Sequence, residues 1–158
     1  MNFTLQFKKL HRDAIVPQRA TDGSAGYDLF PLIAHRVHLA GHGSLVLDTG
    51  IAINIDNPCI AGVIIPRSGL GIRHGIVLGN LTGLVDGDYQ GEIKLSVWNR
   101  TGDAFVIVPE VAVAQMVFVP VLHPTWIETT DFSTTTERGE QGFGHSMGLP
   151  PLTPHNRV

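Results

Sequence analysis

Short runs in which apolar and polar residues strictly alternate are the feature of this sequence that most constrains its fold. Ile51 and Ile93 each begin such a run, with an apolar residue at every second position up to Ile55 and Val97. A period of two is that of a β-strand with one buried face. Turn-forming clusters such as Asp56-Asn57-Pro58 recur between the runs, at spacings typical of a β-sandwich or barrel. The sequence therefore predicts an all-β fold.

Helical signals are sparse along the chain. No segment sustains a helical period, and the one short helical turn that we expect covers residues 68–74, where two glycines weaken it. The 18 glycines and 10 prolines fit many turns between short strands better than a helical protein. The apolar stretch 104–122 is interrupted by two prolines, a glutamate and a glutamine. We therefore expect two buried strands there, not a membrane span.

The chain is expected to form one domain followed by an arm. Its 158 residues suffice for one core, and residues 1–130 carry the strand patterns of the predicted β-sandwich. From Asp131 the sequence becomes rich first in Ser and Thr, then in Gly and Pro, which predicts a flexible C-terminal arm over residues 131–158. The first nine residues lack the apolar core of a signal peptide, so we expect a cytoplasmic protein. Cys59, the only cysteine, lies in an apolar run and is predicted to be a buried thiol.

The charge distribution argues against two kinds of partner. A net charge of -3 with 11 scattered basic residues does not suit a protein that wraps nucleic acid, and no membrane partner is predicted. A small anionic ligand needs only two or three of these cations. The 8 histidines are dispersed without a companion cluster of cysteines or carboxylates, so no metal site built by protein side chains is expected.

Residues 66–71 can form an anion site. The segment follows an apolar strand, and it can place backbone N–H groups, the Arg67 guanidinium and the Ser68 hydroxyl around one anion, with Gly69 permitting a close approach. Phosphate is the natural ligand, because these groups supply several charge-assisted hydrogen bonds at once. The alternative is a strand-to-turn connection with a surface arginine, and the segment alone leaves both open.

Residues 79–91 combine four glycines with two aspartates, Asn80 and Tyr89. Such a density of special backbone positions suits a loop that recognises a planar ligand through its main chain. Asp86 precedes a glycine, where its carboxylate could orient a water molecule and accept a proton. The alternative, which the local sequence by itself favours, is that Asp86 forms only the corner of a β-hairpin.

Two further positions place polar chemistry in an unusual setting. Gln115 interrupts an apolar strand, and a buried amide without partners costs about 1 to 3 kcal/mol, so it needs either a structural network or a ligand. Residues 138–148 place Arg138 and Phe143 among glycines, where the ring could close over a base and the guanidinium over a phosphate. The alternative for this segment is a disordered linker.

Taken together, these segments resemble the five motifs of the dUTPase family in chain order, across residues 25–148. The motifs are Ala25-Gly26-Tyr27-Asp28-Leu29, Pro66 to Gly71, Gly79 to Gly91, Ala114-Gln115 and Arg138 to Gly148. The resemblance implies hydrolysis of dUTP to dUMP and pyrophosphate, which lowers dUTP and supplies dUMP for thymidylate synthesis. It also implies a jelly-roll-like β-sandwich or barrel subunit, a homotrimer with active sites shared between subunits, and Mg²⁺ as the cofactor.

The resemblance implies which residues bind the base and the sugar. Uracil would be bound by Asn80 and by the main chain of Leu84, Val85 and Asp86. Tyr89 would pack beneath the deoxyribose and exclude a 2'-hydroxyl, and Phe143 would stack on uracil.

It likewise implies which residues act on the phosphates. Arg67, Ser68, Gly69 and Gln115 would hold them, with Lys94 close to the substrate. Arg138 would meet the γ-phosphate from a neighbouring subunit's arm. Asp86 would position the attacking water, and Asp28 would lie near the water shell of Mg²⁺.

The chain departs from the family pattern at two points. Ala112 stands three positions before Gln115, where the family often carries a charged residue, so the side chain for an ion pair is missing. His145-Ser146-Met147 follows Gly144, where the family commonly continues Ser-Thr-Gly. The contacts that the family's serine and threonine hydroxyls make to the terminal phosphate therefore cannot be assigned directly to residues of this chain. The His-Ser pair at this point resembles bacterial members of the family.

Two other functions are considered. A dCTP deaminase would share the fold family and the trimer, but it relies on a glutamate base and a different Arg-Ser sequence that we cannot place here. A catalytically silent nucleotide-sensing or scaffold module is disfavoured by the joint presence of Asp86, Arg138 and Phe143. Release of ammonia or of pyrophosphate distinguishes the first rival, and an assay with dUTP and UTP distinguishes the second.

Overall fold

The structure is a computed structural model that describes residues 3–141. The chain divides into two units, one ending at His123 and the other beginning at Pro124. Within the described residues, every helix and strand belongs to the first unit. The described part of the second unit consists of turns, bends and irregular chain.

The described part of the first unit contains ten strands and one helix. In chain order they are β1 (Gln6–Lys9), β2 (Tyr27–Leu29), β3 (Val37–Leu39), β4 (Ser44–Asn54), β5 (Ile60–Pro66), α1 (Ser68–His74), β6 (Ile76–Leu78), β7 (Gly83–Val85), β8 (Glu92–Asn99), β9 (Phe105–Ile107) and β10 (Ala114–Pro120). The all-β prediction is confirmed, and the helix covers the residues expected from the sequence.

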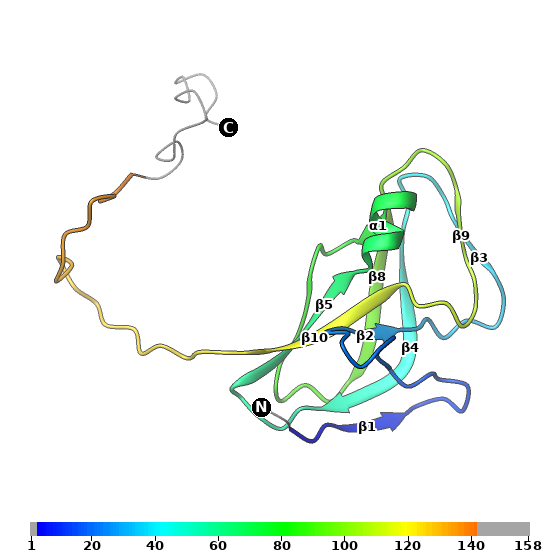
Figure 1. The fold of residues 1–158 in the computed structure, drawn as a ribbon, viewed down its shortest axis with the longest axis horizontal. Helices are drawn as coiled ribbons and strands as arrows, with labels where there is room; N and C mark the ends of the chain where they lie inside the picture. The colour runs from blue at the N-terminus through cyan, green and yellow to red at the C-terminus, as the bar shows by residue number, and fades with distance from the viewer. Residues whose placement is uncertain (1–2, 142–158) are drawn as a thin grey trace. The chain divides into compact units, whose positions relative to one another are not determined.

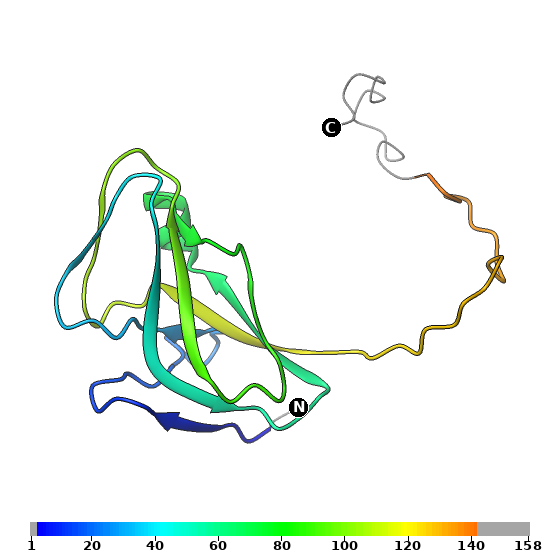
Figure 2. The same cartoon turned by 180° about the vertical axis from the view of Figure 1, so that it is seen from behind.

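The strands form two four-stranded sheets and one ribbon, all with antiparallel pairing. The sheet orders are β1-β4-β8-β6 and β2-β10-β5-β7, and β3 pairs with β9. Figures 1 and 2 show the long strands β4 and β8 on one side of the unit and β5 and β10 on the other. Neighbouring strands are far apart in sequence, so the chain crosses repeatedly between sheets in the manner of a jelly roll.

The core contains alternate residues from both sheets, as the period of two predicts. Ile51 of β4 and Val97 of β8 are both 0% exposed, and Met116 of β10 joins the same apolar cluster. On β8 the intervening residues are less buried, Lys94 among them, so this strand has a face that stabilises the fold and a face available for chemistry. β4 departs from this pattern, because residues 49–53 are all buried.

The short helix α1 is held in place at its C-terminal end. It ends at His74 and is capped by Gly75, which has a φ of 66° and whose N–H group donates to the carbonyl of Leu70. This left-handed conformation favours glycine, and a Cβ at this position would lie 2.5 Å from a methyl group of Thr101. The main-chain N–H of Arg100 also donates to the Gly75 carbonyl, at 3.0 Å. The helix that follows Arg67 is thereby fixed to the end of β8.

A buried amide organises the loop that follows β8. Asn99 is 0% exposed, and its Nδ2 donates to the main-chain carbonyls of Ala40 at 3.2 Å and Asp103 at 2.7 Å. Its Oδ1 accepts from the N–H and the hydroxyl of Thr101. Because both ends of the amide have partners, its burial carries little desolvation cost.

The prediction for Cys59 was wrong, because this residue is exposed. β5 begins one residue later, at Ile60, and Cys59 belongs to the preceding turn. Its N–H donates to Oδ1 of Asn57 at 2.9 Å. An asparagine side chain that accepts a hydrogen bond from the main-chain N–H two residues on forms an Asx-turn, so the strand begins later than the apolar run suggested.

The apolar stretch 104–122 forms two strands, as expected. β9 and β10 are separated by a turn at Pro109-Glu110, where Glu110 has a φ of 63°. No helix in residues 3–141 has the length and apolarity needed to cross a bilayer.

A pair of matched substitutions tests the core. Val97→Ala removes two buried carbons from a residue that is 0% exposed, and we expect it to lower the free energy of unfolding by about 2 to 3 kcal/mol. Val46→Ala on the adjacent strand, at a residue 60% exposed, should change it by less than about 0.5 kcal/mol. Urea unfolding at a fixed protein concentration measures both. Equal losses would contradict the assigned core.

Candidate active site

Five of the predicted site residues line one open cleft in the first unit. The cleft has a volume of about 630 Å³, and the five residues are Asp28, Arg67, Ser68, Gly69 and Gln115. They come from three segments that are far apart in sequence. The structure thus brings together the residues that the sequence assigned to the phosphates and to the water shell of the metal.

Strand β10 is the reason that these segments meet. It lies between β2 and β5, with Gln115 opposite both Asp28 and Ile65. β5 leads at its end into Arg67 and α1, which Figure 1 shows beside the start of β10. The cleft is therefore built where the ends of three strands adjoin.

Arg67 is oriented by two contacts. Its Nε lies 3.1 Å from Oδ1 of Asp28, and its Nη1 donates to the main-chain carbonyl of Ala112 at 3.1 Å. A guanidinium has five N–H donors, so these contacts fix its plane without using all of them. The Ala112 position, which lacks the charged side chain common in the family, thus still contacts Arg67 through its carbonyl.

Gln115 has a structural partner at one end of its amide. Its Nε2 donates to the carbonyl of Pro66 at 3.1 Å, which orients Oε1 toward the loop that contains Gly26. A Cβ at Gly26 would overlap Oε1. The glycine of the first motif therefore allows the close approach of the glutamine of the fourth, whose amide would have to move if a Cβ were added.

Asp86 is not in this cleft. It follows β7 and lines a second hollow, of about 380 Å³, together with Asp88 and His123. β7 pairs with β5 through Val85 and Gly62, which places Asp86 beside the start of β5, whereas Arg67 follows its end. About six residues at about 3.3 Å each separate the two positions, roughly 20 Å. One copy of the chain does not bring Asp86 to Arg67.

A neighbouring turn supports Asp86. Gly87 packs so closely on the Asn57 carbonyl that a Cβ would overlap it, and the Gly87 carbonyl accepts from the N–H of Asp56 at 3.0 Å. Nε2 of His123 donates to the carbonyl of Pro58 at 2.8 Å. The sequence showed residues 56–58 only as a turn, and it gave no signal that Asn57 and His123 stand beside the predicted catalytic carboxylate.

The other residues of the third motif differ in what they expose. The side chain of Val85 is buried, so it can offer a ligand only its main chain, whereas Leu84 is 67% exposed. Asn80 lies in an exposed turn and its carbonyl accepts from the N–H of Thr82. Tyr89 is 43% exposed, and its hydroxyl donates to the main-chain carbonyl of Glu92 at 2.9 Å.

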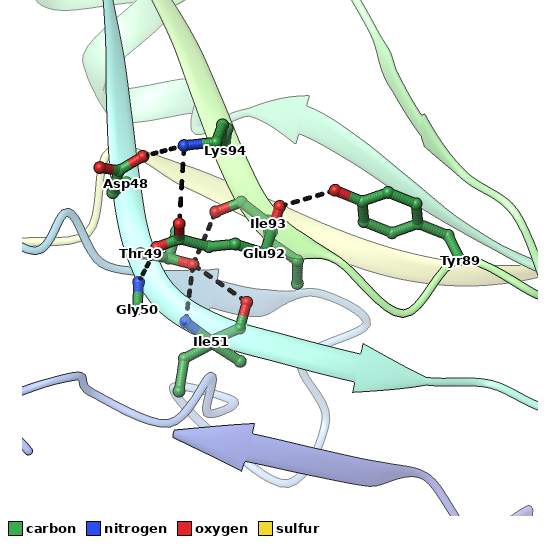
Figure 3. A network of polar contacts seen from close by, with 8 residues as sticks. All are labelled: Asp48, Thr49, Gly50, Ile51, Tyr89, Glu92, Ile93 and Lys94. Atoms are coloured by element: carbon green, nitrogen blue, oxygen red, sulfur yellow. Dashed lines mark hydrogen bonds and ion pairs between the residues drawn. The ribbon is translucent and has the colours of Figure 1, made fainter. Parts of the chain in front are cut away.

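Lys94 is engaged by acidic neighbours on the outer face of β4 and β8. Its ammonium contacts Oδ1 of Asp48 and lies 3.5 Å from Oε2 of Glu92 (Figure 3). The hydrogen bond to Asp48 raises the pKa of Lys94, and the negative charges of Asp48 and Glu92 act in the same direction. A contact between Lys94 and a substrate stays a prediction.

The fifth motif falls in the second unit. Nε of Arg138 donates to the carbonyl of Gln141 at 2.9 Å, and Gly139 has a φ of 53°. Phe143 and the rest of the motif lie outside the described residues.

Comparison with known sequences identifies the family. The family model for dUTPase matches residues 12–147. The chain belongs to the dUTPase family. Curated relatives named deoxyuridine 5'-triphosphate nucleotidohydrolase include that of Psychrobacter cryohalolentis, 51% identical over 83% of this dUTPase chain and 85% of the relative. The one from Enterobacter sp. strain 638 is 53% identical over 83% of the chain and 86% of the relative.

Solved structures confirm the jelly-roll type of fold for this dUTPase. The Staphylococcus bacteriophage 80alpha dUTPase with dUPNHPP has a TM-score of 0.82 and 27% identity, covering 94% of this chain and 100% of that one. A variant of the dUTPase from phage phi11 of S. aureus, described with a structural Mg(II) ion, has a TM-score of 0.74 and 25% identity, covering 84% and 100%.

A glycine substitution tests the cleft of the dUTPase. Gly26→Ala displaces Oε1 of Gln115 without requiring a new backbone conformation, and we expect it to raise the KM for dUTP about three- to tenfold, the loss of roughly one hydrogen bond. Gly23→Ala is the matched control, because no atom lies within 4 Å of its Cβ position. Steady-state kinetics check both, and thermal unfolding shows whether each variant folds. A KM equal to that of the control would contradict the role of Gln115.

Proposed function

We propose that this dUTP diphosphatase hydrolyses its substrate at sites completed by two or more copies of the chain, with Asp86 activating the attacking water. The chain hydrolyses dUTP to dUMP and pyrophosphate, as its family membership establishes. The observation that carries the shared site is the placement of the two halves at opposite ends of β5. Each half is formed within one chain, and only a second copy can bring them together.

An apolar stripe connects the two halves and suits a contact between copies. Val117, Val63 and Leu84 lie directly across from one another on β10, β5 and β7. Each has at least one buried neighbour along its strand, so all three point away from the core. Leu84 is exposed, and Val63 and Val117 are half-buried, and a contiguous apolar surface of this kind suits association. Contact through this face places the Asp86 end of one chain near the Arg67 end of another.

A closed ring of three copies is the assembly that we propose. Either a two-fold pair or a head-to-tail ring satisfies the geometry of one chain, and the resemblance to the family favours the homotrimer. In a ring, each interface holds one complete site, so that three sites form with none left half-built. Light scattering measures the number of copies.

The reaction follows from the chemistry of the two halves. The oxygen of a water molecule attacks the α-phosphorus, the bond from that phosphorus to the oxygen bridging to the β-phosphate breaks, and pyrophosphate leaves. Asp86 accepts the proton of the water. Arg67 and the main chain at Ser68 and Gly69 neutralise and align the phosphates, with Gln115 beside them, and such alignment supplies most of the catalysis in phosphoryl transfer.

Magnesium fits this site only as a companion of the substrate. No group of three or more His, Cys, Asp or Glu side chains among residues 3–141 could hold a metal ion, and the Asp28 carboxylate is engaged by Arg67. Asp28 is thus suited to reach the water shell of Mg²⁺ bound to the triphosphate, not to ligate it directly. The ion would supply neutralisation of phosphate charge.

The remaining roles complete the proposal. Asn80 and the main chain of residues 84–86 bind uracil, and Tyr89 packs beneath the deoxyribose. The segment from residue 131 onward closes over a site of a neighbouring copy, bringing Arg138 to the γ-phosphate and Phe143 to the base. Location in the cytoplasm also stays a proposal.

Substitution of Asp86 tests the chemical step. Asp86→Asn removes the proton acceptor and keeps the size of the side chain, so we expect kcat to fall about 10²- to 10⁴-fold with little change in the affinity for dUTP. Pyrophosphate release measures kcat, and calorimetric titration with a non-hydrolysable analogue measures binding. Asp88→Asn, in the same hollow, is the control and should retain most of the rate. A near-normal kcat in Asp86→Asn would refute the assignment.

Mixing two inactive variants tests the shared site. Chains carrying Asp86→Asn and chains carrying Arg67→Met are each expected to be inactive alone. In equimolar mixed assemblies, roughly a quarter of the sites combine an intact Asp86 with an intact Arg67 from different chains, so that about this fraction of activity should return. Co-expression with two tags and a pyrophosphate assay measure the recovery. Activity no greater than that of the two separate variants would show that the halves do not come from different chains.

A further inference from the structure

The β-bulge in β4 carries a main-chain N–H group whose partner is a side chain. The pairing of β4 with β8 shifts register between Asp48 and Ala52, and Gly50 in this interval has a φ of 67°. Its N–H donates to Oε1 of Glu92 at 2.7 Å, as Figure 3 shows. Glu92 is thus fastened by its side chain to the neighbouring strand.

The bulge is closely packed around this contact. A Cβ at Gly50 would lie 2.8 Å from the Ala14 Cβ and 3.0 Å from the Leu32 Cδ2, so a larger residue does not fit there. The hydroxyl of Thr49, a residue 2% exposed, donates to the carbonyl of Ile93 at 2.7 Å. Two bonds from the bulge therefore fix the first residues of β8.

The main chain of Glu92 holds the ring of Tyr89. The Tyr89 hydroxyl donates to the Glu92 carbonyl at 2.9 Å (Figure 3). The ring lies directly against Gly91, where a Cβ would be 2.5 Å from the hydroxyl oxygen and 2.6 Å from Cζ. The hydroxyl of Tyr89 is thereby hydrogen-bonded to Glu92 of β8, whose side chain is in turn hydrogen-bonded to Gly50 of β4.

We propose that Glu92 is a positioning residue that sets selectivity for the deoxyribose. It acts through Tyr89, and so rests on the proposed role of that ring beneath the sugar. The carboxylate holds Glu92 against the bulge, the Glu92 carbonyl holds the Tyr89 hydroxyl, and the ring stays where it leaves no room for a 2'-hydroxyl. Loss of the anchor frees the ring to move, and UTP is then accepted more readily relative to dUTP.

Two substitutions of Glu92 test this inference. Glu92→Ala removes the acceptor for the Gly50 N–H group, and we expect the ratio of kcat/KM for dUTP to that for UTP to fall about three- to tenfold, as for the loss of one hydrogen bond. Glu92→Gln keeps an oxygen that can accept the same bond and should keep the ratio. Asp48→Asn, which weakens the adjacent Lys94 pair and leaves the Gly50 contact in place, is the control and should also keep it. A purely structural role would lower stability in Glu92→Ala and leave the ratio unchanged, which would overturn the inference.

Substitutions of Tyr89 separate this inference from the proposed function. Tyr89→Phe removes the hydrogen bond to the Glu92 carbonyl and keeps the ring, so by itself it should lower the ratio of kcat/KM for dUTP to that for UTP. Adding Glu92→Ala should lower this ratio little further, because both changes act through one contact. Full additivity of the two changes would overturn the link. If Tyr89→Ala leaves the ratio unchanged, the proposed role of the ring fails. If Tyr89→Ala lowers it while Tyr89→Phe and Glu92→Ala do not, only the inference about Glu92 fails.

Discussion

Strand β10 pairs on both of its edges, and the cleft around Arg67 depends on the register of those two pairings. Gln115 faces outward because Ala114 and Met116, on either side of it, are buried. A slip of one residue would turn Gln115 into the core and Met116 to the surface. The apolar packing of β10 thus decides that an amide stands opposite Asp28 and beside Arg67. The packing that stabilises the fold and the geometry of the cleft proposed to bind phosphate come from the same strand.

The two halves of the site differ in how they are supported. The cleft around Arg67 is fixed by strand pairing, by an ion pair and by a short helix attached to the end of β8. Asp86 stands on a turn, and its position depends on the adjacent turn at residues 56–58. In the proposed shared site, folding of one chain prepares each half separately, and association of copies would then align the two halves.

Much of this arrangement could be predicted from the sequence, for identifiable reasons. Alternation at Ile51 and Ile93 reports local backbone geometry, so the strands and the buried apolar residues at every second position were predictable, whereas the burial of Ala52 on the opposite face was not. Motif residues such as Arg67 and Asp86 were recognisable by type and order. The helix at residues 68–74 was also found, although its glycines made it a weak signal.

Other features depend on contacts between segments far apart in the chain, which local patterns do not contain. Cys59 was predicted to be buried because its neighbours are apolar, whereas the Asx-turn formed by Asn57 places it outside the strand. The contact of Glu92 with the bulge joins residues 42 positions apart. The supporting contact of His123 spans 65 positions, and nothing near either residue in the sequence indicates it.

The exposed position of Cys59 makes the turn beside Asp86 accessible to chemical probes. It is the only thiol in the sequence. Its main-chain N–H donates a hydrogen bond to the side chain of Asn57, whose carbonyl packs against Gly87. A fluorophore or spin label attached there needs no other cysteine to be removed. Such a label would follow the motion of this turn during turnover in the otherwise unaltered chain.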